Sequence, residues 1–399
     1  MLHYRPMLMP KVERLKSKVS RRLSFYIHIP YCIKRCGYCD FNTYTPAELK
    51  GPDLLSVSSN YIAAAIAEIG MARKVVGEAE VPSIFFGGGT PSLMPAQELA
   101  TIIGEIRSKF SLLPDAEITI EVNPDSVTPE FLHEMRAAGA NRISMGMQSA
   151  VPHVLQVLDR THNPENVATA VANARAAGFK HVSVDLIYGA PKESFSDWQS
   201  SVQAALSLPI DHISAYALIV EKGTKLAAQI SRGELELPPE DETAEKYRYA
   251  DNQFIAAGFD WYELSNWSRS GGSCKHNIAY WDGSYWWGVG PGAHSYLDSK
   301  RWWNVKHPNT YIQKVSEGVL PVLNEEVLTE ENLADEYIML QIRRREGIPL
   351  DRLNQKQIEN CTEYLATGHL DEQSWRDRKL TLTQSGRLIA DRIVRSLVM

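Results

Sequence analysis

The sequence has no uninterrupted apolar run near the roughly 20 residues that a transmembrane helix requires. It has no excess of positive charge either, because the formal net charge of its 399 residues is -6. Overall charge therefore gives no reason to expect binding to nucleic acid or to an anionic membrane. Cysteine is scarce, and the five cysteines are an odd number with three inside eight positions. This usage fits metal ligation in a reducing compartment better than a disulfide framework.

The first 23 residues are the one segment with unbalanced charge, since they hold seven basic residues and a single acid, Glu13. A mitochondrial transit peptide has the same bias. The segment is poor in serine, however, and a solvated basic extension is the more ordinary interpretation. We therefore expect a cytoplasmic protein, with the mitochondrial matrix as the alternative if residues 1–23 are a transit peptide.

Short runs of β-branched and aromatic residues alternate with longer helical patterns in the first half of the chain. The runs predict six strands of a parallel sheet, at residues 25–29, 83–87, 117–122, 142–148, 182–189 and 213–220. Helical patterns at 131–139 and 166–178 each end at glycine, where helices commonly stop. We expect an α/β fold, a (β/α)6 partial barrel of the TIM type over residues 24–225, with an open doubly wound sheet as the alternative. In either architecture the site lies at the carboxyl ends of the strands.

The alternation of strands and helices stops beyond residue 225. Residues 226–325 are predicted to be an aromatic and Gly-rich connecting region, in which 261–303 form loops dense in Trp, Tyr and Gly. Residues 326–399 return to charged helical patterns, and 379–398 suggest a short β-hairpin and a helix. We expect a small, mostly helical C-terminal domain that resembles a winged helix. Such a module can bind DNA, but the acidic balance of the chain favours a packing or lid role.

Cys32, Cys36 and Cys39 directly follow the first expected strand, in the spacing Cys-x3-Cys-x2-Cys. One loop thus gathers three thiolates at the carboxyl edge of the sheet, and thiolates select iron-sulfur clusters or zinc. Zinc would need a fourth ligand, for which His28 is the nearest candidate. His28 lies inside the strand, where a hydrogen-bonded histidine is more ordinary than a ligand. A four-iron cluster on three cysteines would leave one iron open to a small molecule.

Two motifs together carry a family resemblance. The cysteine triad after one strand, followed by Gly87-Gly88-Gly89-Thr90-Pro91 after the next, resembles the radical S-adenosylmethionine (SAM) superfamily. The strings YIHIPYCIKRCGYCDF, FFGGGTPS, ITIEVNPDS, RISMGMQS and VSVDLIYGAP resemble the oxygen-independent coproporphyrinogen III oxidase family. The resemblance runs from about Ser24 to the C-terminus. It implies a partial barrel with a helical C-terminal domain and a 4Fe-4S cluster on the cysteine triad.

The resemblance also implies residues that bind SAM. Gly88 and Gly89 would let the backbone approach the methionine amino and carboxylate groups, because glycine has no Cβ in the way. Glu121 would hydrogen-bond the ribose or the amine and complement the positive sulfonium. Tyr38 would contact the adenine, and Tyr26 would contact the methionine end. Positions that surround a second SAM in the oxidases correspond here to Thr90, Gln148, Arg160 and Asp185.

Two departures separate the chain from the oxidases themselves. The oxidases carry a fourth cysteine two residues beyond the triad, where this chain has Asp40-Phe41. They also have a longer N-terminal region, whereas about 23 residues precede the first expected strand here. Oxidative decarboxylation of coproporphyrinogen III is therefore not expected, and no catalytic residue is assigned.

The chain resembles more closely the HemW branch of this family, whose members are haem chaperones. That branch carries a His-Asn-x-x-Tyr-Trp motif, which corresponds here to His276, Asn277, Tyr280 and Trp281. Imidazole is a common ligand of haem iron, and aromatic rings offer flat apolar surface to the macrocycle. His276 is the expected axial ligand, with Cys274 and His294 as alternatives. The alternative interpretation is that these aromatic residues only pack against the flank of the barrel and bind no haem.

Three functions remain open: a haem chaperone, which is favoured, a coproporphyrinogen III oxidase, and another radical SAM enzyme. The expected cofactors are a 4Fe-4S cluster, SAM and haem. The expected partners are haem and a haem-acceptor protein, with a component of a respiratory complex as one candidate, and no nucleic acid.

Overall fold

The computed structural model describes residues 21–49 and 54–398. Residues 1–20, most of the basic segment interpreted as a solvated extension or a transit peptide, lie outside the described residues. The last two arginines of that segment form β1 (Arg21–Arg22), which pairs with a strand of the central sheet. Within the described ranges, no helix combines the length and the apolar character needed to cross a membrane.

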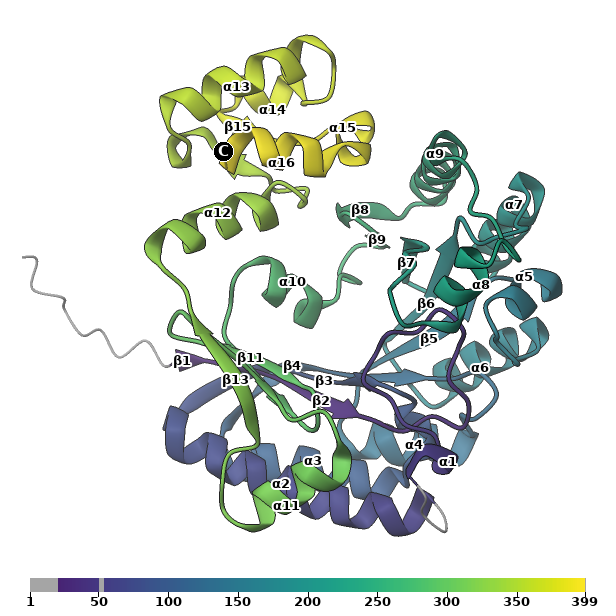
Figure 1. Ribbon diagram of the computed structural model, residues 1–399, viewed down its shortest axis with the longest axis vertical. Helices are drawn as coiled ribbons and strands as arrows, with labels where there is room; N and C mark the ends of the chain where they lie inside the picture. The colour runs from purple at the N-terminus through teal and green to yellow at the C-terminus, as the bar shows by residue number, and fades with distance from the viewer. Residues whose placement is uncertain (1–20, 50–53, 399) are drawn as a thin grey trace, which may run out of the picture.

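Six parallel strands form the centre of the fold and lie beside one another in the order of the sequence. They are β2 (Ser24–Ile29), β3 (Ala79–Gly88), β4 (Ser111–Val122), β5 (Arg142–Gln148), β6 (His181–Tyr188) and β7 (His212–Ala217). A doubly wound sheet reverses its strand order part-way, whereas a barrel adds each new strand to the same edge. The order β2 to β7 therefore confirms the partial barrel, and Figure 1 shows the sheet bending from β2 round to β7.

Helices cover the outer face of the bent sheet (Figure 1). Those between the barrel strands are α1 (Pro46–Leu49), α2 (Leu54–Val76), the 3-10 turn η1 (Pro91–Leu93), α3 (Ala96–Lys109), α4 (Pro129–Ala138), α5 (Pro152–Val157), α6 (Pro164–Ala176) and α7 (Phe195–Leu206). Both helices predicted to end at glycine do so, because Gly139 follows α4 at φ 111° and Gly178 closes the turn after α6 at φ 86°. Alternate strand residues such as Phe25 and Ile120 are buried under these helices. The residues between them face the barrel interior.

Strands from beyond residue 225 extend the same sheet at both edges. On one side β10 (Trp286–Val289) pairs with β2, and β11 (His294–Leu297), β12 (Lys300–Asn304) and β13 (Val322–Val327) follow outward. On the other side β9 (Asn266–Ser268) pairs with β7, and β8 (Asp260–Glu263) forms the edge. Helices α8 (Lys225–Ser231), α9 (Glu240–Ala256) and α11 (Pro308–Ser316) belong to the same part of the chain. The prediction that 261–303 form loops was wrong, because strands β8 to β12 lie largely in this range. Short aromatic strands that pair only with distant partners resemble Gly-rich loops in sequence.

The C-terminal part of the chain has a hydrophobic core of its own, made of residues between 338 and 397. Its helices are α12 (Glu330–Gln341), the 3-10 turn η2 (Leu350–Arg352), α13 (Gln355–Ala366), α14 (Glu372–Arg376), α15 (Gln384–Leu388) and α16 (Ala390–Val398). The predicted hairpin does not form, because β15 (Lys379–Leu380) pairs with the distant β14 (Ile348–Pro349). The helical character of this part is confirmed, and the domain boundaries at residues 24, 226 and 326 stay predictions.

Candidate functional site

The three cysteines lie on the loop that leaves the carboxyl end of β2 and leads to α1. Cys32, Cys36 and Cys39 are free thiols and are half-exposed. Two side chains predicted to bind SAM point toward these sulfurs: Thr90 Oγ1 lies 3.8 Å from Cys32 Sγ, and a guanidinium nitrogen of Arg160 lies 3.7 Å from Cys36 Sγ. Such donors stabilise a thiolate, which is the form that binds iron. The structure thus places two of the predicted ligand residues beside two of the three cysteines.

His28 is not available as a fourth metal ligand. Its Nε2 donates to the Asn42 carbonyl at 2.9 Å, and its Nδ1 accepts a hydrogen bond from the Tyr26 hydroxyl at 3.1 Å. Burial lowers the pKa of His28, so the ring is neutral with both nitrogens engaged. Within residues 21–49 and 54–398, no three His, Cys, Asp or Glu side chains converge as a single metal ion requires. The zinc interpretation gains no support, and the iron-sulfur assignment rests on the spacing and the family of the triad.

The Gly-rich turn after β3 is bound to the cysteine loop through its backbone. Gly89 N–H donates to the Ile29 carbonyl at 2.7 Å, and Thr90 N–H donates to the Tyr31 carbonyl at 2.8 Å. A Cβ on Gly89 would stand 2.4 Å from the Tyr31 oxygen, and Gly88 has φ 104°. Neither position accepts a side chain without distortion. The two glycines therefore fix the cysteine loop against the end of β3.

Two acidic side chains face the interior of the barrel. Glu121 on β4 accepts a hydrogen bond from Gly88 N–H at 3.3 Å, and Asp185 on β6 accepts one from the Ser144 hydroxyl at 3.1 Å. Burial, together with the charge of Asp185, raises the pKa of Glu121 to about 8, and burial also raises the pKa of Asp185. Two carboxyl groups with so few donors suit a ligand that brings hydroxyl groups and positive charge.

The other residues predicted to bind SAM lie around the same interior. Tyr26 on β2 is close enough to Glu121 for its pKa to be raised by that carboxyl, in addition to the larger effect of burial. Tyr38, in the cysteine loop, packs against an apolar group that includes residues of α5. Gln148 ends β5 at φ 60°, and Arg160 donates to the Gly146 carbonyl at 2.8 Å. The predicted SAM residues therefore come from every barrel strand except β7, or from the segments that follow those strands.

The His-Asn-x-x-Tyr-Trp motif forms a short helix, α10 (Lys275–Trp281), which lies inside the bend of the sheet (Figure 1). Glu117 on β4 accepts hydrogen bonds from the N–H groups of Lys275 and His276, both at 3.0 Å, and pairs with the buried Arg142 at 2.9 Å. A carboxylate at this end compensates the free N–H groups of a helix. Glu117 was not among the predicted site residues, although a charged residue inside a strand is a recognisable signal.

His276 is buried between three side chains. Its Nδ1 lies 2.9 Å from Ser83 Oγ and its Nε2 lies 3.0 Å from the Tyr280 hydroxyl. The ring is stacked on Phe85, with centroids 5.1 Å apart, and burial lowers the pKa of His276 to about 4. Ser83 also bonds to Ser24, the first residue of β2, whereas the cysteines follow the last. His276 is therefore neutral, engaged at both nitrogens and remote from the cysteine loop, and this arrangement does not support its predicted role as a haem ligand.

The other members of the motif connect separate parts of the fold. The Asn277 side chain donates to Glu263 on β8 at 2.8 Å, and the Tyr280 ring meets Trp286 on β10 edge-on at 4.8 Å. The Trp281 carbonyl accepts a hydrogen bond from Gln341 on α12 at 2.6 Å. In this arrangement the motif joins β8 and β10, which lie on opposite sides of the six barrel strands, to the C-terminal part.

The two alternative haem ligands differ in exposure. Cys274 Sγ donates to Glu117 at 3.2 Å, and burial raises the pKa of this thiol well above its ordinary value. His294, at the start of β11, is exposed, and its ring is stacked against Trp303 with centroids 5.6 Å apart. Of the three side chains considered as haem ligands, His294 is thus the one that faces solvent.

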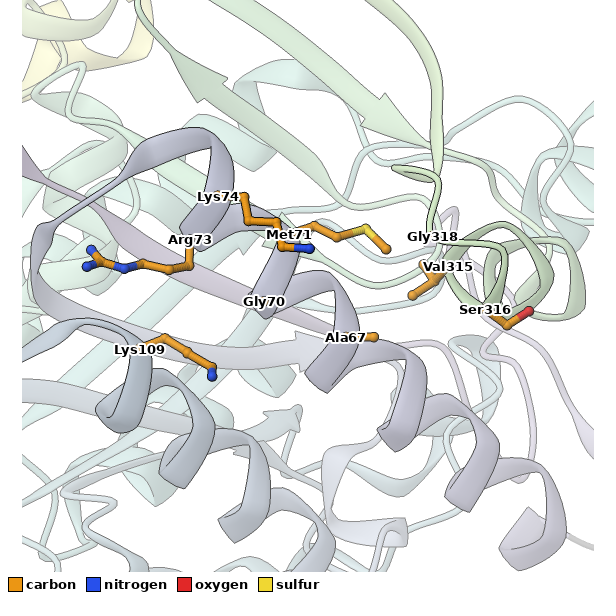
Figure 2. Close-up of a pocket in the computed structure, with 9 residues that line it drawn as sticks. All are labelled: Ala67, Gly70, Met71, Arg73, Lys74, Lys109, Val315, Ser316 and Gly318. Atoms are coloured by element: carbon orange, nitrogen blue, oxygen red, sulfur yellow. The ribbon is translucent and has the colours of Figure 1, made fainter.

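A hollow of about 470 Å³ lies on the outer side of the helices, away from these residues. It is formed by α2, the end of α3 and the end of α11, and Figure 2 shows the basic side chains of Arg73, Lys74 and Lys109 around it. None of the predicted cofactor residues lines this hollow, so it does not belong to the site at the carboxyl ends of the strands.

Comparison with known proteins supplies the family. The model of the radical SAM superfamily matches residues 26–205. The protein named "Heme chaperone HemW" from Mycobacterium tuberculosis is 49% identical over 94% of this chain and 94% of its own length. The chain belongs to the HemW family. HemW of Bacillus subtilis is 33% identical over 84% of this chain and 86% of its own length.

More distant relatives agree with this placement. "Radical S-adenosyl methionine domain-containing protein 1, mitochondrial" from Mus musculus is 38% identical over 71% of this chain and 64% of its own length. Among solved structures, the coproporphyrinogen III oxidase HemN of Escherichia coli superposes with a TM-score of 0.80 at 22% identity, over 95% of this chain and 91% of HemN. The likeness to HemN confirms the fold predicted for this HemW family member.

Proposed function

We propose that the chain is a haem chaperone of the radical SAM class, which binds a 4Fe-4S cluster and SAM, carries haem and delivers it to an acceptor protein. The observation that carries this proposal is the identity of 49%, over 94% of both chains, with a protein named as a haem chaperone. The cysteine triad and the two interior carboxyl groups support the cluster and SAM parts of the proposal.

Cys32, Cys36 and Cys39 would bind three irons of the cluster. The fourth iron would stay open to the amine and carboxylate of SAM. Thr90 and Arg160 already point donors at two of the sulfurs and would stabilise the negative charge of the thiolates. The donor set therefore fits a cluster that takes one ligand from outside the protein.

Glu121 and Asp185 would face the amine, ribose or sulfonium of SAM. Their raised pKa values reflect burial without adequate donors, and a cationic ligand with hydroxyl groups would relieve that cost. Tyr26 and Tyr38 would provide ring contacts to the methionine end and the adenine. Gln148, at the end of β5, would contact a second SAM.

The test is haem titration of the full-length, anaerobically reconstituted protein, followed at the Soret band, beside an assay with coproporphyrinogen III, SAM and a reductant. We expect saturable haem binding and no protoporphyrinogen IX, because Phe41 replaces the cysteine that the resemblance places here in the oxidases. Formation of protoporphyrinogen IX without saturable haem binding would show that the chain is an oxidase instead.

A further inference from the structure

One histidine of the aromatic region has a free ring. The ring nitrogens of His28 and His276 are engaged in hydrogen bonds, and the Cys274 thiol is buried against Glu117. His294 is exposed, and in the described part of the chain its ring nitrogens have no hydrogen-bond partner. Because neutral imidazole is a common ligand of haem iron, His294 is the side chain of this group that an iron centre could reach from solvent.

The surrounding strands hold His294 in one orientation. Its ring is stacked against Trp303 on β12, with 20° between the ring planes. Its carbonyl accepts a hydrogen bond from Trp286 Nε1 at 3.0 Å, and a Cβ on Gly288 would stand 2.2 Å from that same carbonyl oxygen. An imidazole bound to haem iron stands perpendicular to the macrocycle. Trp303 would therefore support the imidazole from the side and would not stack on the macrocycle.

Positive charge lies near this imidazole. Partial burial, Lys306 and Arg301 lower the pKa of His294, which keeps the ring neutral near pH 7, as metal binding requires. Arg301 already pairs with Glu336. Lys306 is exposed, and no carboxylate of the described residues lies within salt-bridge distance of its ammonium. A lysine without a partner beside a free imidazole suits a ligand that carries a carboxylate.

An apolar ring from the cysteine loop lies at the same edge of the molecule. Phe41 is 61% exposed. The next residue, Asn42, donates from its side chain to the carbonyls of Pro291 at 3.0 Å and Lys306 at 2.8 Å. Since Pro291 precedes β11 and Lys306 follows β12, these bonds fix the end of the cysteine loop beside both strands. The edge formed by β11, β12 and this loop thus offers an imidazole, an apolar ring and a cation.

Haem has the matching groups, because it combines an iron centre with a flat apolar macrocycle and two propionates. We propose that haem binds at this edge, with His294 as an axial ligand of the iron, Phe41 as an apolar contact and Lys306 as the partner of a propionate. The inference rests on the haem chaperone function proposed above. It places haem beside the cysteine loop and not at α10.

Haem titration of the full-length protein with a reconstituted cluster tests the iron ligand. His294→Ala should shift the Soret band and weaken haem binding about tenfold, because an iron-nitrogen bond is lost. Free imidazole added to this variant should restore the wild-type spectrum, since it can occupy the space that the side chain leaves. His133→Ala is the matched control, because His133 is an exposed histidine on α4, and it should bind haem as the wild type does.

A second comparison tests the propionate partner. Lys306→Met should weaken haem binding about two- to fivefold, as expected for an exposed ion pair. It should leave binding of haem dimethyl ester unchanged, because esterified propionates carry no charge. Lys74→Met, which makes the same replacement at the hollow of Figure 2, should affect neither ligand.

The outcomes separate this inference from the function on which it rests. An unchanged Soret band and affinity in His294→Ala, while the wild type binds haem, would overturn the placement and leave the chaperone proposal intact. A wild-type protein with no saturable haem binding would overturn both. Loss of haem binding in His276→Ala at full cluster content, with normal binding in His294→Ala, would return the site to α10.

Discussion

At the scale of single residues, the cysteines differ in exposure and this difference predicts their roles. Cys361 is buried in the C-terminal core, where burial raises its pKa to about 12, while the triad is half-exposed on one loop. We expect Cys32→Ala, Cys36→Ala and Cys39→Ala each to lose the cluster and Cys361→Ala to keep it, because Cys361 lies in the separate hydrophobic core of the C-terminal part and not on the loop of the triad. Iron and sulfide analysis with electron paramagnetic resonance measures this. Full iron content in a triad variant would contradict the assignment.

The triad could be predicted from the sequence because its spacing is local and its chemistry is specific. The environment of His276 could not, because Ser83 and Glu117, which hold its side chain and its backbone, lie far away in the chain. Phe41 and Lys306 belong to no motif for haem, and the hydrogen bonds that Asn42 and Tyr44 donate to the Lys306 carbonyl, which join their two segments, became visible only in the fold. Local sequence patterns could indicate which residues are candidates for a site. Which residues lie next to them in space could be determined only from the fold.

At the scale of one element, α10 carries an imidazole whose protonation opposes folding. Burial lowers the pKa of His276 from 6.5 to about 4, so the folded chain binds this proton less readily than the unfolded chain. The contribution of this pKa shift to the free energy of unfolding is fully present above about pH 6.5 and is lost as the pH falls toward about 4. Between about pH 7.5 and about pH 5, the wild type should lose about 2 kcal/mol more stability than His276→Gln, measured by anaerobic urea denaturation.

The exposed His133 provides the control for this measurement. His133→Gln should follow the wild type at both pH values, because the His133 side chain is exposed to solvent on α4 and is not buried by folding. Equal pH dependence in the wild type and in His276→Gln would mean that His276 is not buried as described.

The barrel strands could be predicted because each is a run long enough to show its pattern. β4 nevertheless begins at Ser111 and not at residue 117. Its first half was missed because it contains Pro114 and Asp115, and both residue types are uncommon inside strands. The strands from β8 to β12 were missed because each has only three to five residues. These segments are strands because they pair with distant segments, as β10 does with β2. The periodicity of apolar residues in a sequence carries no information about a distant partner.

At the scale of the whole molecule, a buried ion pair attaches the C-terminal part to the barrel. Arg387 on α15 donates to both oxygens of Asp251 on α9, at 2.9 and 2.6 Å, and its guanidinium lies over the Trp261 ring at 4.3 Å. Arg387→Met should lower the free energy of unfolding by about 3 kcal/mol, because it leaves a buried carboxylate without its cation. Urea denaturation measures the loss, and limited proteolysis should release the C-terminal part more readily.

An exposed pair of the same type provides the comparison. Arg376 and Glu372 on α14 are 2.9 Å apart with both side chains more than two-thirds exposed. Arg376→Met should cost less than about 1 kcal/mol. If the two arginine variants were equally stable, the ion pair at Asp251 would not be what attaches the C-terminal part.

Asn42 also imposes an order on the assembly of the protein. It comes three residues after the last cysteine of the triad, yet its acceptors Pro291 and Lys306 lie 249 and 264 residues later. β2, from which the cysteine loop departs, likewise gains one of its neighbours only when β10 has been made. Since a chain is synthesised from its N-terminus, the loop lacks these anchors until about three quarters of the protein has left the ribosome. The cysteine loop is thus among the first segments made, but its contacts through Asn42 form late, so we expect stable insertion of the proposed cluster to belong to a late stage of maturation.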